Sequence, residues 1–250
     1  MFTLMQANPT VEILEAEYLR LLGYPKDHPL EGRARELADE AQAWFSKNGR
    51  PWIYARECSS LELKSRNVCI GGVSFSSNKL REILSDALAH SVMLVAVSAG
   101  RECEEHAREL WNEGKPDEYF FLETCGSAAV EQLIAVASGH ICAWADGNQM
   151  AALPHFSPGY SGWDIREQAA FWRLFQQSFN GRLPGELEVL DSGMLRPKKS
   201  LLAVIGLTRD LEKARGFQKL IPCENCSLPD CHYRRGPYKR PRPSMDNPRR

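Results

Sequence analysis

The sequence lacks most of the features that assign a chain to a class of protein at first sight. No continuous apolar run approaches the roughly 20 residues that span a bilayer, so we expect no membrane helix. Residues 1–10 lack the basic and apolar regions of a secretory signal, which favours a cytoplasmic protein. Gly71-Gly72 is not part of a phosphate loop, no G-x-G-x-x-G follows an expected strand, and Gly126-Ser127-Ala128 lacks the G-x-S-x-G pattern. These absences argue against the two common kinds of nucleotide-binding enzyme and against α/β-hydrolases.

What is present is an ordinary composition with an uneven distribution of charge. The 250 residues are 43% hydrophobic and 25% charged, typical of a globular chain long enough for one substantial core or two small ones. Residues 232–250 contain seven Lys or Arg and one Asp, a net charge of +6, so the preceding residues carry −7 of the chain's net −1. We interpret this tail as a solvated, flexible arm. Docking on an acidic partner remains open, and its prolines and short length do not favour nucleic acid as a partner.

The eight cysteines fall into two groups. Cys223, Cys226 and Cys231 form C-x2-C-x4-C, whereas the other five are scattered along segments that have the pattern of regular structure. In a reducing compartment such clustering favours metal binding over disulfides. Three thiolates beside arginines suit an iron–sulfur cluster or zinc, with free or redox-exchanging thiols as the alternative. Zinc also needs a fourth ligand, for which the candidates are Cys58, Cys69, His106, His140, His232 or a residue of a partner.

The spacing of apolar residues predicts a mixture of helices and strands. The expected helices are 11–22, 30–47, 76–88, 102–113, 119–137 and 164–178, with Gly23 capping the first and Asp164 the last. The expected strands are 51–55, 67–70, 91–97, 187–190 and 201–207, the last two as neighbours in one sheet. Because these elements do not follow a strict β-α-β alternation, we expect an α+β fold rather than a doubly wound one.

The segment HFSPGYSGWD, residues 155–164, contains a Pro-Gly-Tyr turn at the start of an expected amphipathic helix. Gly159 allows the backbone to approach a ligand closely, and the amides that enter the helix can receive an anionic group. Tyr160 offers a flat surface and a hydroxyl. The pattern therefore predicts a small-molecule site, with a simple loop around a packed tyrosine as the alternative.

Four segments together resemble the activation domain of cobalamin-dependent methionine synthase, and especially the stand-alone relatives of that domain. They are YLRLLGY (18–24), LETCGSAAVE (122–131), FSPGY (156–160) and MLRPKKS (194–200), and the last two are the specific ones. The resemblance covers most of residues 11–210. It implies a curved, mainly antiparallel sheet with flanking helices in an activation-domain-like α+β domain, residues 1–220, followed by a Cys-rich, basic appendage, residues 221–250.

Members of that family bind S-adenosylmethionine and present it to oxidised cobalamin, which is remethylated after a one-electron reduction. The resemblance implies a binding site formed by Glu131, His155, Ser157, Pro158, Gly159 and Tyr160, with Tyr160 at the reacting centre. A carboxylate at Glu131 suits a sulfonium cation or an amino group, although an exposed helix charge is the alternative. The family usually has arginine where this chain has His155, and histidine cannot make the same bidentate contact with a ligand carboxylate. We therefore expect binding that is weaker, pH-dependent or absent.

The sequence also lacks Asp-x-His-x-x-Gly, the motif with which methionine synthase's cobalamin module supplies an axial histidine. The resemblance thus implies that cobalamin is carried by a partner, either a corrinoid-binding protein or a methionine synthase without its own activation domain. A separate electron donor is implied as well. The expected function is that of an accessory protein for reductive reactivation of a corrinoid methyltransferase. The alternative is an iron–sulfur or zinc module for electron transfer or interaction that reuses the fold without S-adenosylmethionine.

Overall fold

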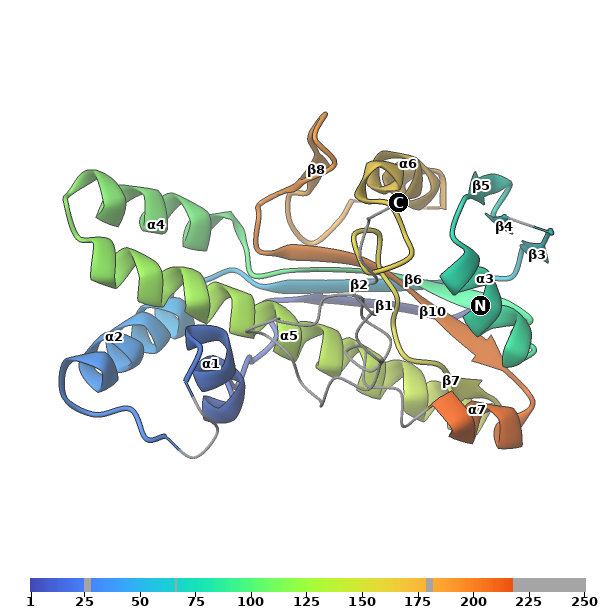
Figure 1. The fold of residues 1–250 in the computed structure, drawn as a ribbon, viewed down its shortest axis with the longest axis horizontal. Helices are drawn as coiled ribbons and strands as arrows, with labels where there is room; N and C mark the ends of the chain where they lie inside the picture. Colours follow the sequence, from blue (N-terminus) through green and yellow to red (C-terminus); the bar gives the residue numbers. More distant parts are fainter. Residues whose placement is uncertain (25–27, 66, 179–181, 218–250) are drawn as a thin grey trace, which may run out of the picture.

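The computed structural model describes residues 1–24, 28–65, 67–178 and 182–217. At its centre is a five-stranded sheet of strand order β1-β2-β6-β10-β7, in which every neighbouring pair is antiparallel (Figure 1). Its strands are β1 (Thr3–Ala7), β2 (Trp52–Cys58), β6 (Ser91–Ser98), β7 (Ala151–Ala152) and β10 (Ser200–Thr208). Two small antiparallel sheets comprise β3 (Leu61–Leu63), β4 (Val68–Ile70) and β5 (Val73–Phe75), and β8 (Glu188–Val189) with β9 (Leu195–Arg196).

The strands β6 and β10 form the middle of the core because both of their faces are covered. All residues of β6 are buried. Along β10, Leu202 and Val204 pack on one side of the sheet, whereas Ala203 and Ile205 pack on the other. Side chains of a strand alternate between faces, so an uninterrupted apolar strand requires a packed layer on each face.

Helices supply these two layers (Figure 1). On one side lies the long α5 (Pro116–Gly147), which shares a core with the odd-numbered residues of β10. Helices α1 (Glu15–Leu22), α2 (Gly32–Asn48) and α4 (Arg101–Asn112) pack against the first half of α5 in a separate core. On the other side lie α3 (Asn78–Asp86) and α6 (Gln168–Ser178), which share a core with Leu202 and Val204. The short α7 (Leu211–Phe217) lies beside β7 and adds Ala214 to this core (Figure 1). The expected α+β fold with a curved, mainly antiparallel sheet and flanking helices is confirmed.

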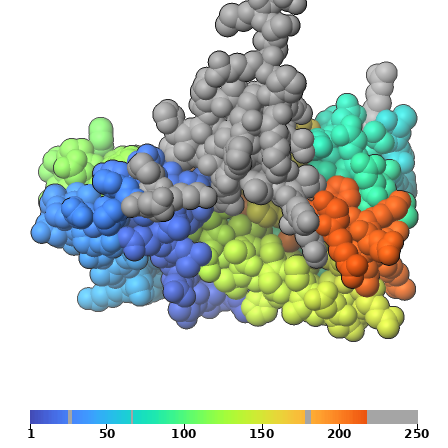
Figure 2. All heavy atoms as spheres, turned by 60° about the horizontal axis from the view of Figure 1, so that its bottom comes forward, coloured from blue at the N-terminus to red at the C-terminus, as the bar shows by residue number. Residues whose placement is uncertain are grey.

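Helix α5 is longer and more apolar than the sequence led us to expect. It has 32 residues, and one 18-residue window of it has a mean hydropathy of 1.3. By length and composition, α5 is the one helix among the described residues that could cross a membrane. The lack of a continuous apolar run in the sequence did not lead us to expect a helix of this length and hydropathy. However, 56% of this window is buried, and Leu133, Ala137 and Ile141 pack against the sheet. Figure 2 shows the rest of α5 at the surface between α1 and α7. The helix is thus packed as a core helix of a globular domain is.

Most expected elements are present, and the differences concern their length and neighbours and the elements that we did not predict, namely β1, β3, β5, β7, β9 and α7. The expected helix 119–137 continues to Gly147 because Ile141 and Ala145 keep one face buried. The expected strands 187–190 and 201–207 are not neighbours, which corrects our prediction. Instead β8 pairs with β9, while both edges of β10 are already hydrogen-bonded, to β6 and to β7. The expected appendage, residues 221–250, lies outside the described residues.

Candidate functional site

The segment that contains the Pro-Gly-Tyr turn runs along the edge of β10. After β7, Phe156 forms an antiparallel bridge with Val204, in which each amide donates to the other residue's carbonyl oxygen at 2.8 Å. The buried Ser157 hydroxyl then donates to the carbonyl oxygen of Leu202 at 2.6 Å. The chain is therefore held against the sheet up to the residue that precedes Pro158.

Two glycines determine the shape of the turn. Gly159 has a φ of 92°, and its amide donates to the carbonyl oxygen of Trp163 at 2.9 Å. Gly162 has a φ of 94°, and a Cβ atom there would lie only 2.7 Å from Cβ of Lys79. Residues with side chains rarely adopt such positive φ values, so both positions favour glycine. Gly159 is also exposed, which leaves its backbone open to a ligand.

Aromatic side chains gather around Tyr160, which is half-buried. Nε2 of His155 lies 3.0 Å from the Tyr160 hydroxyl, within hydrogen-bonding distance. The ring of Phe156 meets Tyr160 edge-on, with centroids 5.8 Å apart, and stacks on Trp163 at 6.0 Å. The phenol ring is thus fixed from two sides by residues of its own segment.

Side chains from α3 and from the helix after the turn hold it on the opposite side. The Ser77 hydroxyl donates to the carbonyl oxygen of Gly162 at 2.7 Å. The indole Nε1 of Trp163 donates to Oε2 of Glu167 at 2.7 Å, and the carboxylate of Glu167 also accepts from the amide of Ser76 at 2.9 Å. The turn is therefore connected to three parts of the fold, namely β10, α3 and the start of α6.

Asp164 caps the helix that follows the turn, as expected. A 3-10 turn at Ile165–Glu167 leads directly into α6, and the Asp164 carboxylate accepts from the amide of Arg166 at 2.9 Å. Hydrogen bonds from the guanidinium and the amide of Arg166 lower the pKa of Asp164 to about 2. This end of the turn therefore carries an ion pair between Asp164 and Arg166 at neutral pH.

Two of the four motif segments meet at α5. Nζ of Lys198 lies 2.8 Å from one carboxylate oxygen of Glu123, and Nζ of Lys199 lies 3.1 Å from the other. Lys199 also donates to the Ser127 hydroxyl at 2.8 Å. A Cβ atom at Gly126 would lie 3.1 Å from Cγ of Lys199, so the lysine stem packs on the bare backbone of the helix. We did not predict this network. The pattern in the sequence that could have indicated this network is Glu123 followed by the small residues Gly126-Ser127.

No family model matches the chain, and no curated protein matches it. Among solved structures, the chain is similar to the crystal structure described as the MetH reactivation domain bound to AdoHcy, with a TM-score of 0.60 over 82% of this chain and 79% of that one. The chain has the fold of that reactivation domain. Only 12% of the residues are identical, so the likeness is one of fold. At this level, the resemblance expected from the four motif segments is confirmed.

Within this reactivation-domain fold, Glu131 lies on α5 where α1 packs. One carboxylate oxygen of Glu131 lies 4.0 Å from Nη2 of Arg20, and its side chain is 34% exposed. Closer to the start of α5, the Tyr18 hydroxyl donates to the carbonyl oxygen of Phe121 at 2.8 Å, which also ties α1 to α5. The first and second motif segments are therefore in contact. The role of Glu131 in ligand binding stays a prediction.

The expected metal ligands Cys223, Cys226 and Cys231 lie outside the described residues. Within the part of the chain that the structure describes, no group of three or more His, Cys, Asp or Glu side chains is placed to hold a metal ion. Four of the suggested fourth ligands lie on four separate elements, namely Cys58 (β2), Cys69 (β4), His106 (α4) and His140 (α5). The body of the reactivation-domain fold therefore lends no support to zinc or an iron–sulfur cluster.

Proposed function

We propose that this chain binds S-adenosylmethionine at the turn formed by residues 155–160 and assists the reductive remethylation of a corrinoid on a partner protein. The observation that carries the proposal is the Pro158-Gly159-Tyr160 turn, which is held on β10 in a fold shared with a reactivation domain that binds AdoHcy. AdoHcy is S-adenosylhomocysteine, the compound that remains once S-adenosylmethionine has given up its methyl group. A site that binds S-adenosylhomocysteine therefore also suits S-adenosylmethionine, which differs from it by the methyl group and the positive charge on sulfur.

The turn offers the surfaces that an adenosyl compound needs. Tyr160 presents a fixed, half-buried aromatic ring on which the adenine can stack, and a hydroxyl that can form a hydrogen bond. The exposed Gly159 allows the ligand to approach the main chain. Ser157 is buried and its hydroxyl is engaged by Leu202, so we assign Ser157 to positioning the turn. Pro158, which is also buried, restricts the backbone between Ser157 and Gly159.

We infer that His155 has another role than the arginine that the resemblance implies at this position. Its Nε2 atom is directed at the Tyr160 hydroxyl, 3.0 Å away, so it orients the phenol. A histidine in this position cannot form the pair of parallel hydrogen bonds that an arginine makes with a ligand carboxylate. We therefore propose tyrosine-centred recognition of the ligand, with Glu131 as the acidic group facing its amino or sulfonium cation.

The reacting group and the electron come from other proteins in this proposal. The partner's cobalamin would supply the chemistry: it would accept the methyl group of S-adenosylmethionine once a separate donor has provided one electron, and S-adenosylhomocysteine would be left. This chain binds the methyl donor, orients it through Tyr160 and keeps its methyl group directed outward. The partner is a corrinoid-binding protein or a methionine synthase that lacks its own activation domain.

A second candidate function rests on the C-x2-C-x4-C pattern of Cys223, Cys226 and Cys231. If these residues hold an iron–sulfur cluster or zinc, the chain is an electron-transfer or interaction module that has kept the fold without the methyl donor. The histidine at position 155 favours this candidate. Iron, zinc and sulfide analysis of the anaerobically purified full chain tests it.

Isothermal titration of the full chain, purified without oxygen, tests the first proposal. We expect S-adenosylmethionine and S-adenosylhomocysteine to bind in the micromolar range, and Tyr160→Ala to abolish the heat. Tyr160→Phe is the matched control, because it keeps the ring and should retain most of the affinity. Absence of binding by the wild-type chain, or equal binding by Tyr160→Ala, would refute the assignment of the site.

A further inference from the structure

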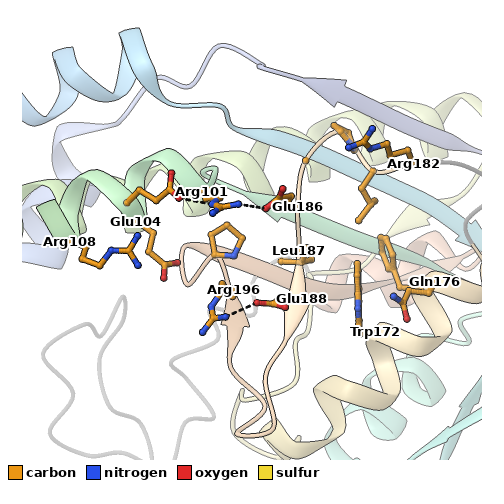
Figure 3. Close-up of a pocket in the computed structure, with 16 residues that line it drawn as sticks. Arg101, Glu104, Arg108, Trp172, Gln176, Arg182, Glu186, Leu187, Glu188 and Arg196 are labelled. Carbon is orange, nitrogen blue, oxygen red and sulfur yellow. Dashed lines mark hydrogen bonds and ion pairs between the residues drawn. The ribbon is translucent and has the colours of Figure 1, made fainter.

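A cleft lies away from the Tyr160 turn, and none of the residues that line it belongs to the segment 155–164. It has a volume of about 1150 Å³ and is formed by α4, the end of α6, the segment 182–188, and β9 with Pro197 (Figure 3). Ligand sites in proteins commonly measure about 300–1,000 Å³, so this cleft can hold a molecule of nucleotide size.

Arginines from separate elements line this cleft. Arg101 lies within hydrogen-bonding distance of Glu105 (2.7 Å) and of Glu186 (3.0 Å), a contact that joins α4 to the segment before β8. Arg196 of β9 pairs with a carboxylate of β8 at 2.9 Å. These two guanidinium groups are thus neutralised and serve to hold the walls of the cleft together.

Two further arginines of the cleft are differently placed. Arg108 on α4 and Arg182 are exposed, and within the described residues neither forms an ion pair. Figure 3 shows Arg108 at the α4 end and Arg182 at the opposite end, beyond Leu187. A ligand that lies along the cleft would therefore meet a guanidinium with free donors at either end. Guanidinium groups bind phosphate through paired hydrogen bonds.

The wall of the cleft that α6 contributes is aromatic (Figure 3). Trp172 and Phe175 on α6 stack with their centroids 5.7 Å apart and an interplanar angle of 21°. Trp172 is half-buried, so part of its ring remains accessible, and Leu187 and Pro197 complete the surface. Such a surface suits a flat aromatic ring system.

We propose that this cleft binds a small planar aromatic compound that carries phosphate, such as a nucleotide or flavin mononucleotide. Its ring packs on Trp172, and its phosphate pairs with Arg108 or Arg182. The glutamates of the cleft exclude a long polyanion, because four carboxylates (Glu104, Glu105, Glu186 and Glu188) balance the four guanidinium groups. A single phosphate pairs locally, whereas an extended acidic chain would meet no net positive charge.

Isothermal titration of the full chain with ADP and with flavin mononucleotide tests the proposal, with adenosine and riboflavin as the phosphate-free controls. We expect at least one phosphorylated compound to bind in the micromolar range, and its phosphate-free counterpart to bind roughly tenfold more weakly or worse, which corresponds to about 1.4 kcal/mol. The double variant Arg108→Gln/Arg182→Gln and the variant Trp172→Leu should each lose at least as much.

Arg173→Gln is the matched control, because Arg173 is exposed on α6 next to Trp172 but does not line the cleft. It should bind as the wild type does. Tyr160→Ala should also bind normally here, which separates failure of this proposal from failure of the proposed function. Circular dichroism confirms that each variant is folded. The proposal is overturned if neither compound binds at millimolar concentration, if the double variant binds as tightly as the wild type, or if only a poly-glutamate peptide binds.

Discussion

Replacement of Gly159 by alanine should destabilise the protein, because the turn requires a backbone conformation that alanine resists. At a φ of 92°, a side chain costs about 1–3 kcal/mol of conformational strain. A Cβ atom would also lie 2.9 Å from Cδ1 of Ile165, but this atom is the end of a flexible side chain and can shift. We therefore expect the free energy of unfolding to fall by about 1–3 kcal/mol, mostly from the backbone.

Urea denaturation measures this change, and two further variants of the chain make the result interpretable. Gly139→Ala is the matched control: Gly139 is exposed within α5, and a Cβ atom there meets nothing within 4 Å. It should stabilise the protein by up to about 1 kcal/mol, because alanine is the better helix former. Ile165→Val removes Cδ1, so Gly159→Ala in that background isolates the backbone contribution.

If Gly159→Ala proved as stable as the wild type, the positive φ and the reasoning built on it would be wrong. If Ile165→Val restored all the lost stability, the cost would be steric rather than conformational. The same variants also report on binding. A turn displaced by alanine should bind S-adenosylmethionine more weakly, whereas Gly139→Ala should bind normally.

Three other predictions concern charges and thiols. Lys199→Met should lower the free energy of unfolding by about 1–2 kcal/mol. This loss is smaller than for a fully buried pair, because Lys198 also contacts Glu123. Urea denaturation should show a smaller loss when Lys199→Met is made in a Glu123→Gln background. The pKa of Asp164 is lowered in the folded state, so its contribution to stability is present above the unfolded value near 3.8 and lost as the pH falls through about 2. Carbon-13 NMR titration should give that lower value, and Arg166→Gln should move it back toward 3.8. Burial raises the pKa of Cys103 to about 12, so iodoacetamide at pH 8 should leave it unmodified in the native protein, and early labelling found by mass spectrometry would contradict its burial.

Some of the candidate site could be predicted from the sequence because its determinants are local. The Pro-Gly-Tyr turn and the Asp164 cap depend on residues within a few positions of one another. Gly23 ends α1 in the left-handed conformation for the same reason. Helix α5 was predicted too short, because the residues that carry it past Ala137 are held by the sheet and not by their neighbours in sequence.

The sequence by itself determined most of the longer helices and strands, the caps at Gly23 and Asp164, and the four segments that resemble a known family. The tertiary structure alone decided that Phe156 and Ser157 add to the edge of β10, that Lys198 and Lys199 meet Glu123, and that α4, α6 and β9 enclose a cleft. Local patterns follow from the fixed periods of helix and strand. Strand order, long-range ion pairs and cavities depend instead on which apolar faces pack together, and that choice is made by the whole core at once.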